Sequence, residues 1–242
     1  MKKILASKLN EYAQLCPPKP GAKKWIDDSN QWMSLYTALC LQSIRVEKRT
    51  LVSILEGQIM ENVNMGLYGF CFRFRDIYKS MVGAIEMQAS LNRKVLDGWY
   101  RDLFMAEEPI YRRSNSVVYD IGFIPCHHSE IAEEMDKLLR TCEFIEDPIE
   151  ASIKVHLGLV KIYPYGRESI VMGLIAGMFY LLKAGIPLPS YPVSEDEYCR
   201  LVSQWINEGS SEAFMDMHYR SLLNRADTVL SVCRQAQEAS GE

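Results

Sequence analysis

The chain has 242 residues, 48% of them hydrophobic, and a formal net charge of −4. That hydrophobic fraction is typical of a packed globular protein and excludes a wholly disordered chain, and the length suits one large domain with or without a small appendage. Basic residues occur in blocks no longer than a pair, which argues against nucleic-acid binding through a basic stripe.

The seven cysteines are an odd number and form no Cys-x-x-Cys pair. Scattered cysteines of this kind indicate reduced thiols in a reducing compartment. The first residues, MKKILASKLNEY, contain only a brief apolar run and do not resemble a signal peptide. We therefore expect a cytoplasmic protein with no membrane segment; the composition leaves delivery into another cell open.

The N-terminal residues predict a short amphipathic helix over 2–15, followed by an extended arm at Pro17–Gly21. Asp27, Asp28 and Ser29 are helix-start residues, and the spacing of apolar residues predicts one long helix over 32–55. We divide the chain accordingly into an N-terminal helix and arm, residues 1–34, and a main domain, residues 35–242.

Most of the remaining chain has helical spacing of apolar residues. Helices are predicted over 68–88, 91–105 and 131–144, from Asp147–Pro148 onward, and over 194–207 and 211–238. Residues 114–125, SNSVVYDIGFIP, are instead rich in β-forming residues and predict a hairpin that lies on the helical body.

The centre of the fold is expected at residues 153–187, which read as a buried helix, a polar loop and a second buried helix. The second helix is apolar on nearly every side but shorter than the ~20 residues that cross a bilayer, which indicates a core helix. The loop at its start, residues 163–169, is the natural place for an anion to meet free backbone N–H groups.

This order of elements, and several short segments, resemble the Fic (Fido) family. The matching segments before the core helices are Tyr111-Arg112-Arg113, Val117-Val118-Tyr119, Ile121-Gly122, Phe123-Ile124-Pro125, Glu130-Ile131 and Met135-Leu138-Leu139. Those within and after the core helices are Asp147-Pro148-Ile149, Ala151, His156, Leu159-Val160, Ile162-Tyr163-Pro164-Tyr165 and Leu182 to Pro187. The resemblance implies a mainly α, Fic-like helical bundle with one β-hairpin flap.

Typical Fic proteins transfer AMP from ATP to a hydroxyl of a target protein. Their active loop reads His-Pro-Phe-x-(Asp/Glu)-Gly-Asn-Gly-Arg-x-x-Arg, in which the His is the base, the acid holds Mg²⁺ and the glycines and arginines hold phosphates. Aligned without gaps, Tyr163 replaces the base, Pro164 is kept, Tyr165 replaces Phe and Arg167 replaces the metal acid, with Gly166 between them. Glu168-Ser169-Ile170 replace Gly-Asn-Gly, and Val171 and Leu174 replace the arginines.

These replacements remove the chemistry of AMP transfer. A tyrosine with a pKa near 10 is only about 0.1% ionised at pH 7, so Tyr163 is a poor base. Glu168 repels phosphates, Val171 and Leu174 cannot bind them, and Mg²⁺ meets Arg167 in place of a carboxylate. We therefore predict no cofactor, although the resemblance implies ATP and Mg²⁺ for the family.

Two other segments resemble regulatory and docking parts of the family. Ser53, Glu56 and Gly57 resemble the self-inhibitory motif, but the arginine that its Glu would pair with is Leu174 here. Val117, Val118, Tyr119, Asp120, Ile121 and Gly122 resemble the flap that pairs with an extended target segment. Strand addition uses backbone groups, so target docking is the function this chain keeps most easily.

Each candidate residue also has a structural interpretation. Tyr163 and Tyr165 are candidates for catalysis but are better explained as residues that pack on helix ends, and Arg167 is a candidate anion contact near a helix start. His127 and His128 beside Cys126 lack a spaced partner pair for a metal, and we expect a surface turn. His156 is expected to be buried and hydrogen-bonded.

Two hypotheses follow. In the first, the chain is a degenerate Fic-fold protein without AMP transfer that binds or regulates a protein through the flap. In the second, it is a Fic-fold transferase that uses an unusual nucleotide or nucleotide-sugar donor, whose charge is met by Arg167, Arg112 or Arg113. Neither involves nucleic acid, a membrane or a bound metal, and both leave oligomerisation open.

Overall fold

The computed structural model describes residues 1–115, 117–191 and 194–239. Over these residues the chain forms ten α-helices and two short 3-10 turns. They are α1 (Lys2–Gln14), α2 (Pro20–Cys40), α3 (Lys48–Leu55), α4 (Met65–Glu86), α5 (Arg93–Phe104), η1 (His128–Glu130), α6 (Ile131–Glu143), α7 (Pro148–Ile162), η2 (Gly166–Glu168), α8 (Ser169–Lys183), α9 (Glu195–Glu208) and α10 (Glu212–Glu238). The predicted helical fold class is confirmed.

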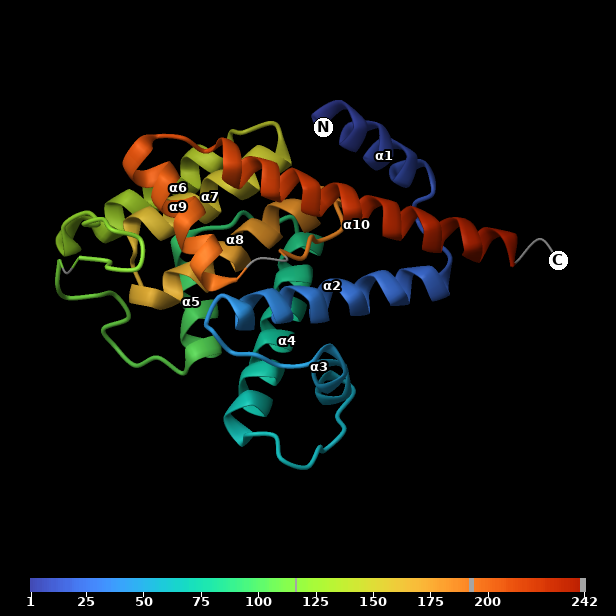
Figure 1. The fold of residues 1–242 in the computed structure, drawn as a ribbon, viewed down its shortest axis with the longest axis horizontal. Coiled ribbons are helices and arrows are strands. Elements are labelled where there is room, and N and C mark those ends of the chain that lie inside the picture. The colour runs from blue at the N-terminus through green and yellow to red at the C-terminus, as the bar shows by residue number, and fades with distance from the viewer. Residues whose placement is uncertain (116, 192–193, 240–242) are drawn as a thin grey trace.

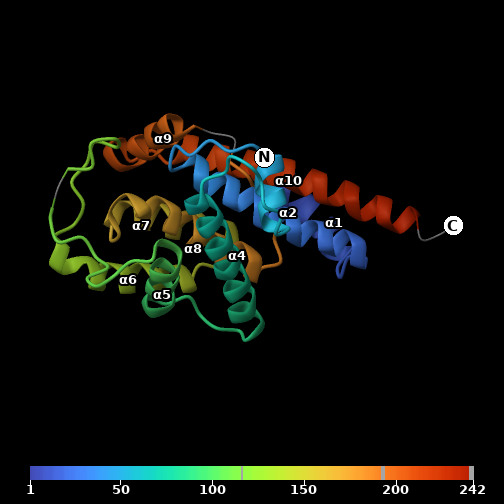
Figure 2. The ribbon, with the colours of Figure 1, turned by 90° about the horizontal axis from the view of Figure 1, so that it is seen from below.

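Helix α8 is the centre of the bundle, as its composition predicts. It packs against α7, α4 and α5, and Figure 2 shows it between α7 and α4. Every residue from Ser169 to Phe179 is buried. The α7–α8 pair is the closest in the fold because Gly173 and Gly177 of α8 lie against the α7 backbone at His156 and Ser152.

Gly173→Ala is expected to lower the free energy of unfolding by about 1–3 kcal/mol, the usual effect of overpacking. The added Cβ would lie 2.8 Å from the backbone oxygen of His156, so α7 and α8 must move apart. Gly83→Ala in α4 is the matched control, because a Cβ there meets nothing within 4 Å and alanine favours the helix. Denaturant unfolding compares the two, and equal effects would contradict the close approach.

A second layer is built on the long helix α10. Figure 1 shows α10 running along the long axis of the molecule, and both α1 and α2 pack against it. The predicted extended arm and helix start at Asp27 are wrong, because α2 already begins at Pro20. Proline fits the first turn of a helix, and Ile26 is buried against α10 through Val229 and Leu230, which extends the helix toward its N-terminus.

The predicted long helix over 32–55 is also wrong, because α2 ends at Cys40 and α3 starts at Lys48. Ser43 adopts a left-handed φ of 59°, and the N–H of Ile44 closes on the carbonyl of Leu39 at 2.9 Å. This is a helix-terminating turn without the glycine or proline that would mark it in the sequence. The predicted division of the chain between residues 34 and 35 falls inside α2 and stays a prediction.

The β-rich segment forms a turn with a single antiparallel bridge between Val118 and Phe123. No strand is present among the described residues, so the predicted hairpin is not confirmed; Ser116 lies outside them. The backbone N–H groups of Val118 and Phe123 bond across the turn, at 2.9 and 3.4 Å. We call residues 117–123 the flap. It belongs to the long connection between α5 and α6, which loops out at one end of the bundle (Figure 1).

Candidate functional site

The loop at residues 163–169 joins the two central helices through a tight reversal. Tyr163 ends α7 in a left-handed conformation, with φ of 56°, and its N–H bonds to the Leu159 carbonyl at 2.9 Å. Gly166 has φ of 64° and starts the 3-10 turn η2, which leads directly into α8. A left-handed tyrosine is unfavourable by about 1 kcal/mol or more, so contacts around the loop must hold it.

Arg112 supplies those contacts. Its backbone N–H donates to the carbonyl of Pro164 at 2.9 Å, and its guanidinium reaches across to the end of α7. The guanidinium donates to the carbonyls of Tyr163, Ile162, Cys126 and Ser114 and to Oδ1 of Asn115. An arginine has five N–H donors, so this side chain is fully occupied by protein oxygens. Arg112 therefore positions the loop and has no donor left for a bound anion.

Tyr165 is a core residue. It is 3% exposed, and its hydroxyl donates to Oδ1 of Asp97 at 2.6 Å. Its ring stacks on Tyr100 with centroids 4.1 Å apart, and Tyr111 donates to the other oxygen of Asp97 at 2.6 Å. Burial, with the charge of Asp97, raises the pKa of Tyr165 far above its usual value. Tyr165 and Asp97 thus anchor the loop to α5 and present no reactive group.

Tyr163 is the side chain of the loop that faces the flap. It is half-buried, and its ring meets Phe123 edge-on with centroids 6.2 Å apart. Burial first, and then the negative charges of Glu168 and Asp120, raise its pKa to about 12. At pH 7, about 5 units below this pKa, only about one Tyr163 side chain in 10⁵ is ionised. In this environment Tyr163 is ionised less often at pH 7 than a free tyrosine, so less phenolate is present to act as a base.

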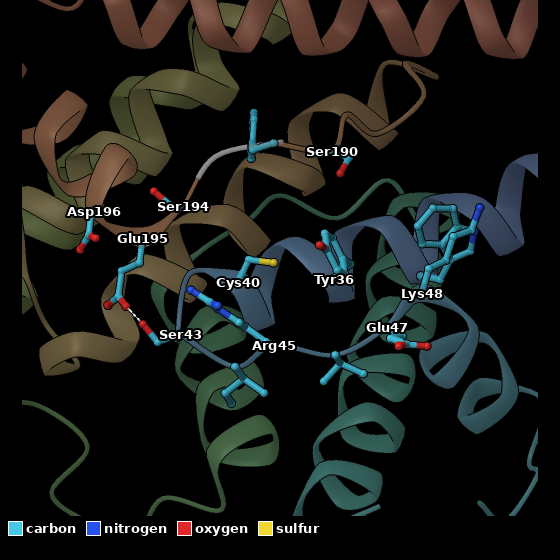
Figure 3. Close-up of a pocket in the computed structure, with 14 residues that line it drawn as sticks. Tyr36, Cys40, Ser43, Arg45, Glu47, Lys48, Ser190, Ser194, Glu195 and Asp196 are labelled. Carbon is cyan, nitrogen blue, oxygen red and sulfur yellow. Dashed lines mark hydrogen bonds between the residues drawn. The ribbon is translucent and has the colours of Figure 1, made fainter.

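Arg167 is held by a carboxylate from another helix. Its guanidinium donates to Oε1 of Glu195, the first residue of α9, and this contact raises the pKa of Arg167. The other carboxylate oxygen of Glu195 accepts the hydroxyl hydrogen of Ser43, as Figure 3 shows. Glu195 therefore connects the loop, α9 and the turn after α2, and it neutralises the cation that the sequence offered as an anion contact.

Two hollows meet at Glu195. The larger, about 1120 Å³, lies between the end of α2, the turn that follows it and the start of α9 (Figure 3). Its walls include Trp32, Tyr36 and Tyr191, and Lys48 lies over the Trp32 ring, 4.2 Å from its centroid.

The smaller hollow, about 510 Å³, lies between the flap, the loop and α9. Its charged lining residues are Asp120, Glu195, Asp196, Glu208, Arg167 and Arg200. Four carboxylates thus face two guanidiniums, one of which is already bound to Glu195. We call this hollow the acidic pocket; its charge disfavours a polyphosphate.

The remaining positions of the aligned loop are also accounted for. Val171 and Leu174 are 0% and 4% exposed and belong to the hydrophobic core, so no side chain at these positions reaches the pocket. Ser169 is fully buried, and its hydroxyl accepts the N–H of Tyr165 at 3.0 Å. Glu168 lies close enough to raise the pKa values of Tyr163 and Tyr100.

The segment that resembles an inhibitory motif forms a helix end. Glu56 caps α3, Gly57 has φ of 83°, and the N–H of Gln58 closes on the Ser53 carbonyl at 2.9 Å. Helix α3 packs on α2 and α4. Glu56 is exposed and its charge acts on Lys24 of α2. These contacts explain Glu56-Gly57 as a helix stop that glycine favours.

The flap has buried residues that pack on the helical body and exposed residues at its tip. Val118, Ile121 and Phe123 are buried, whereas Tyr119 is 87% exposed. The side-chain amide of Asn207 at the end of α9 donates to the Ile121 carbonyl at 3.2 Å. The flap therefore has a buried base and an exposed tip of Tyr119 and Asp120.

The histidines follow the structural interpretation. His127 accepts the N–H of Ser129 and caps the turn η1, with His128 beside it. No group of three or more His, Cys, Asp or Glu side chains that could hold a metal ion lies within the described residues. His156 is 2% exposed, and its Nε2 lies 2.7 Å from the Tyr198 hydroxyl, which confirms its expected burial and hydrogen bond.

Sequence reasoning missed Asp97, Glu195 and the structural role of Arg112. Asp97 lies on the buried face of α5, between Leu96 and Trp99. A carboxylate at such a position needs partners, and this was the one signal available in the sequence. Glu195 looked like an ordinary acidic residue at a helix start, and nothing local shows that it lies against Arg167.

Comparison with solved structures identifies the architecture. The chain superimposes on a Fic-domain signalling protein from Bacteroides thetaiotaomicron with a TM-score of 0.80, covering 96% of this chain and 98% of the other at 15% identity. The chain has the Fic fold.

Two other Fic proteins match over nearly the whole chain. Residues 134–508 of Fic-1 from Caenorhabditis elegans match with a TM-score of 0.79 at 13% identity, covering 97% of this chain and 73% of the other. A Fic family protein from Desulfovibrio desulfuricans matches with a TM-score of 0.70 at 14% identity, covering 95% and 72%.

Sequence comparison finds no protein-family model and no curated protein that match. None of the helices in the described ranges is both long and apolar enough to span a membrane.

Proposed function

We propose that this chain is a Fic-fold protein with a degenerate active loop, that it does not transfer AMP, and that it acts by binding or regulating a protein through the flap. The observation that carries the proposal is the state of the charges at residues 163–169. Arg167 is bound to Glu195, Arg112 is bound to backbone and side-chain oxygens, and the acidic pocket holds four carboxylates. A nucleoside triphosphate would enter a site whose net charge repels it.

The general base is absent as well. A phenol with a pKa of about 12 is ionised in about one molecule in 10⁵ at pH 7, and a positioned base contributes roughly 10²–10⁴-fold to a rate. In the aligned loop Arg167 stands where Mg²⁺ would need a carboxylate. The missing base and the missing metal ligand both disfavour AMP transfer, as the negative charge of the acidic pocket does. We infer that protein docking is the function that remains.

The test is ATP binding and AMP transfer. Calorimetry with ATP and Mg²⁺ is expected to show no saturable binding up to about 1 mM, a free energy weaker than about −4 kcal/mol. Glu195→Gln is expected to release Arg167 and to allow weak binding that the wild type lacks. Incubation with labelled ATP and a lysate is expected to label no protein above the level of a heat-denatured control.

Two site variants, each compared with a control variant elsewhere on the protein, define the results that would contradict the proposal. Saturable ATP binding by the wild type that Arg167→Ala abolishes and Arg220→Ala preserves would overturn the proposal; Arg220 is a surface arginine paired with Asp216 in α10. AMP incorporation that Tyr163→Phe abolishes and Tyr180→Phe preserves would do the same, since Tyr180 lies near the end of α8, away from the loop and the flap.

The second hypothesis, transfer from an unusual donor, named three arginines to meet the donor's charge, and one of them stays available. Arg112 and Arg167 are engaged, and Arg113 is exposed and has no charged or hydrogen-bonding partner among the described residues. The same calorimetry with other nucleoside triphosphates and nucleotide-sugars tests it. Binding of one of these donors that Arg113→Ala abolishes would favour the transferase.

A further inference from the structure

We propose that a groove on the outer side of the flap binds a short segment of a partner protein in which apolar side chains alternate with carboxylates. The proposal rests on the proposed protein-binding function and names the surface and the chemistry of the partner. The groove is about 880 Å³ and lies between the flap, α6, α7 and the end of α9. We call it the lysine groove.

The floor of the lysine groove is apolar. It is formed by Phe123, Ile124 and Pro125 after the flap turn, by Leu138 of α6 and by Trp205 of α9. Ile124 is 67% exposed, although it is a large aliphatic residue in a chain with a well-buried core. A hollow of this size with an apolar floor is suited to bind two or three apolar side chains.

The rim of the groove is basic, although the whole chain has a net charge of −4. Lys137, Lys154 and Lys161 line it, and among the described residues Glu134 is the one acidic residue on its wall. Lys137 is paired with Glu134 at 3.8 Å, and Lys161 lies over the Trp205 ring at 5.8 Å. Lys154 and Lys161 have no carboxylate partner among the described residues, so they offer two free positive charges to an acidic segment.

The flap separates this groove from the acidic pocket. Asp120 lines the acidic pocket, Val117 and Gly122 line the groove, and Asn207 holds the flap between them through the Ile121 carbonyl. An acidic segment is therefore attracted to one side of the flap and repelled from the other. This contrast favours an acidic, apolar segment over a basic one and gives it one place to bind.

The experiment uses short dye-labelled peptides and the full chain. A peptide of alternating leucine and glutamate is expected to bind saturably in fluorescence anisotropy, and more weakly at high salt, where the charges are screened. A leucine–lysine peptide and a serine–glutamate peptide are expected not to bind. Failure of the leucine–glutamate peptide to bind, or equal binding of the leucine–lysine peptide, overturns the proposal.

Variants locate the site. The double variant Lys154→Glu/Lys161→Glu is expected to weaken peptide binding about tenfold or more, because two favourable charge pairs become two repulsions. Lys79→Glu, a lysine at an exposed mid-helix position of α4, is the matched control. Ile124→Ser is expected to weaken binding, whereas Ile59→Ser, at a residue 94% exposed between α3 and α4, is not. Equal effects of variant and control would overturn the site.

A fatty-acid competitor and ATP calorimetry distinguish two other outcomes. Dodecanoate is included as a competitor; if it displaces the peptide and binds more tightly, the groove binds an acyl anion and the peptide proposal fails. ATP calorimetry on the same proteins reports separately on the loop, which none of these substitutions touches. Failure of the wild type to bind the leucine–glutamate peptide, together with no ATP binding, rejects the groove alone, whereas saturable ATP binding by the wild type rejects the proposed function.

Discussion

Lowering the pH from 7 to 5 is expected to reduce the free energy of unfolding by about 4 kcal/mol through two buried histidines. Burial lowers the pKa values of His156 and His218 to about 3 each, and the two side chains are 2% and 1% exposed. Their ring nitrogens meet the hydroxyls of Tyr198 and Tyr191 at 2.7 and 2.5 Å, which are neutral partners. Nε2 of His218 has no partner among the described residues.

The direction of the effect follows from the two pKa values. The unfolded chain binds a proton at each histidine near pH 6.5, while the folded chain binds none until about pH 3. Stability is therefore fully present above pH 6.5 and falls as the pH falls toward 3, by about 1.4 kcal/mol per pH unit for each histidine. Between pH 7 and 5 this gives about 2 kcal/mol for each side chain.

Denaturant unfolding at several pH values tests this prediction. His156→Gln/His218→Gln removes both titrating groups and keeps polar side chains, so its pH dependence between 7 and 5 is expected to be smaller than that of the wild type by about 4 kcal/mol. The difference between the two proteins cancels the contribution of the carboxylates. An identical pH dependence in both proteins would show that these histidines do not titrate as their burial requires.

Arg112→Ala is expected to lower the free energy of unfolding by about 3 kcal/mol. The substitution removes five hydrogen bonds to oxygen from a half-buried guanidinium and leaves the carbonyls of Ile162 and Tyr163, at the end of α7, without this donor. The left-handed Tyr163 then loses a contact that holds it. We also expect amide hydrogen exchange to become faster over 162–168, because the loop opens more often.

Arg113→Ala is the control for this prediction. Arg113 is the next residue, carries the same charge and is exposed without a partner among the described residues, so its loss is expected to change stability by less than about 0.5 kcal/mol. Arg112→Lys keeps the charge but not the five-donor geometry and is expected to behave like alanine. Full stability of Arg112→Lys would mean that charge alone, and not the set of hydrogen bonds, holds the loop.

Several parts of the fold were predictable because they depend on neighbours in the sequence. The all-round apolar composition of α8, with Gly185 and Pro187 after it, identifies a core helix and its end. Asp147 and Pro148 start α7, and the observed cap, with Asp147 accepting the N–H of Ile149 at 2.8 Å, is the one that the pattern predicts. Short family-like segments in the right order then identified the Fic fold without a close relative.

Other parts were not predictable because they depend on distant partners. Helix α2 begins at Pro20 because α10, two hundred residues later, covers its first turns. The β-rich segment forms only one bridge, although its composition favours strands. Propensity is a weak guide where tertiary contacts decide the outcome.

By itself, the sequence determined the central helix pair and the length of the loop between them, and it predicts the loss of the residues that AMP transfer needs. Only the tertiary structure decided what the remaining charges do. Arg167 could bind an anion in the sequence, but Glu195, 28 residues away, occupies it. Arg112 could meet a donor phosphate, but the end of α7 takes its hydrogen bonds. The physical reason is that a charge acts through its nearest partner in space, which local sequence does not specify.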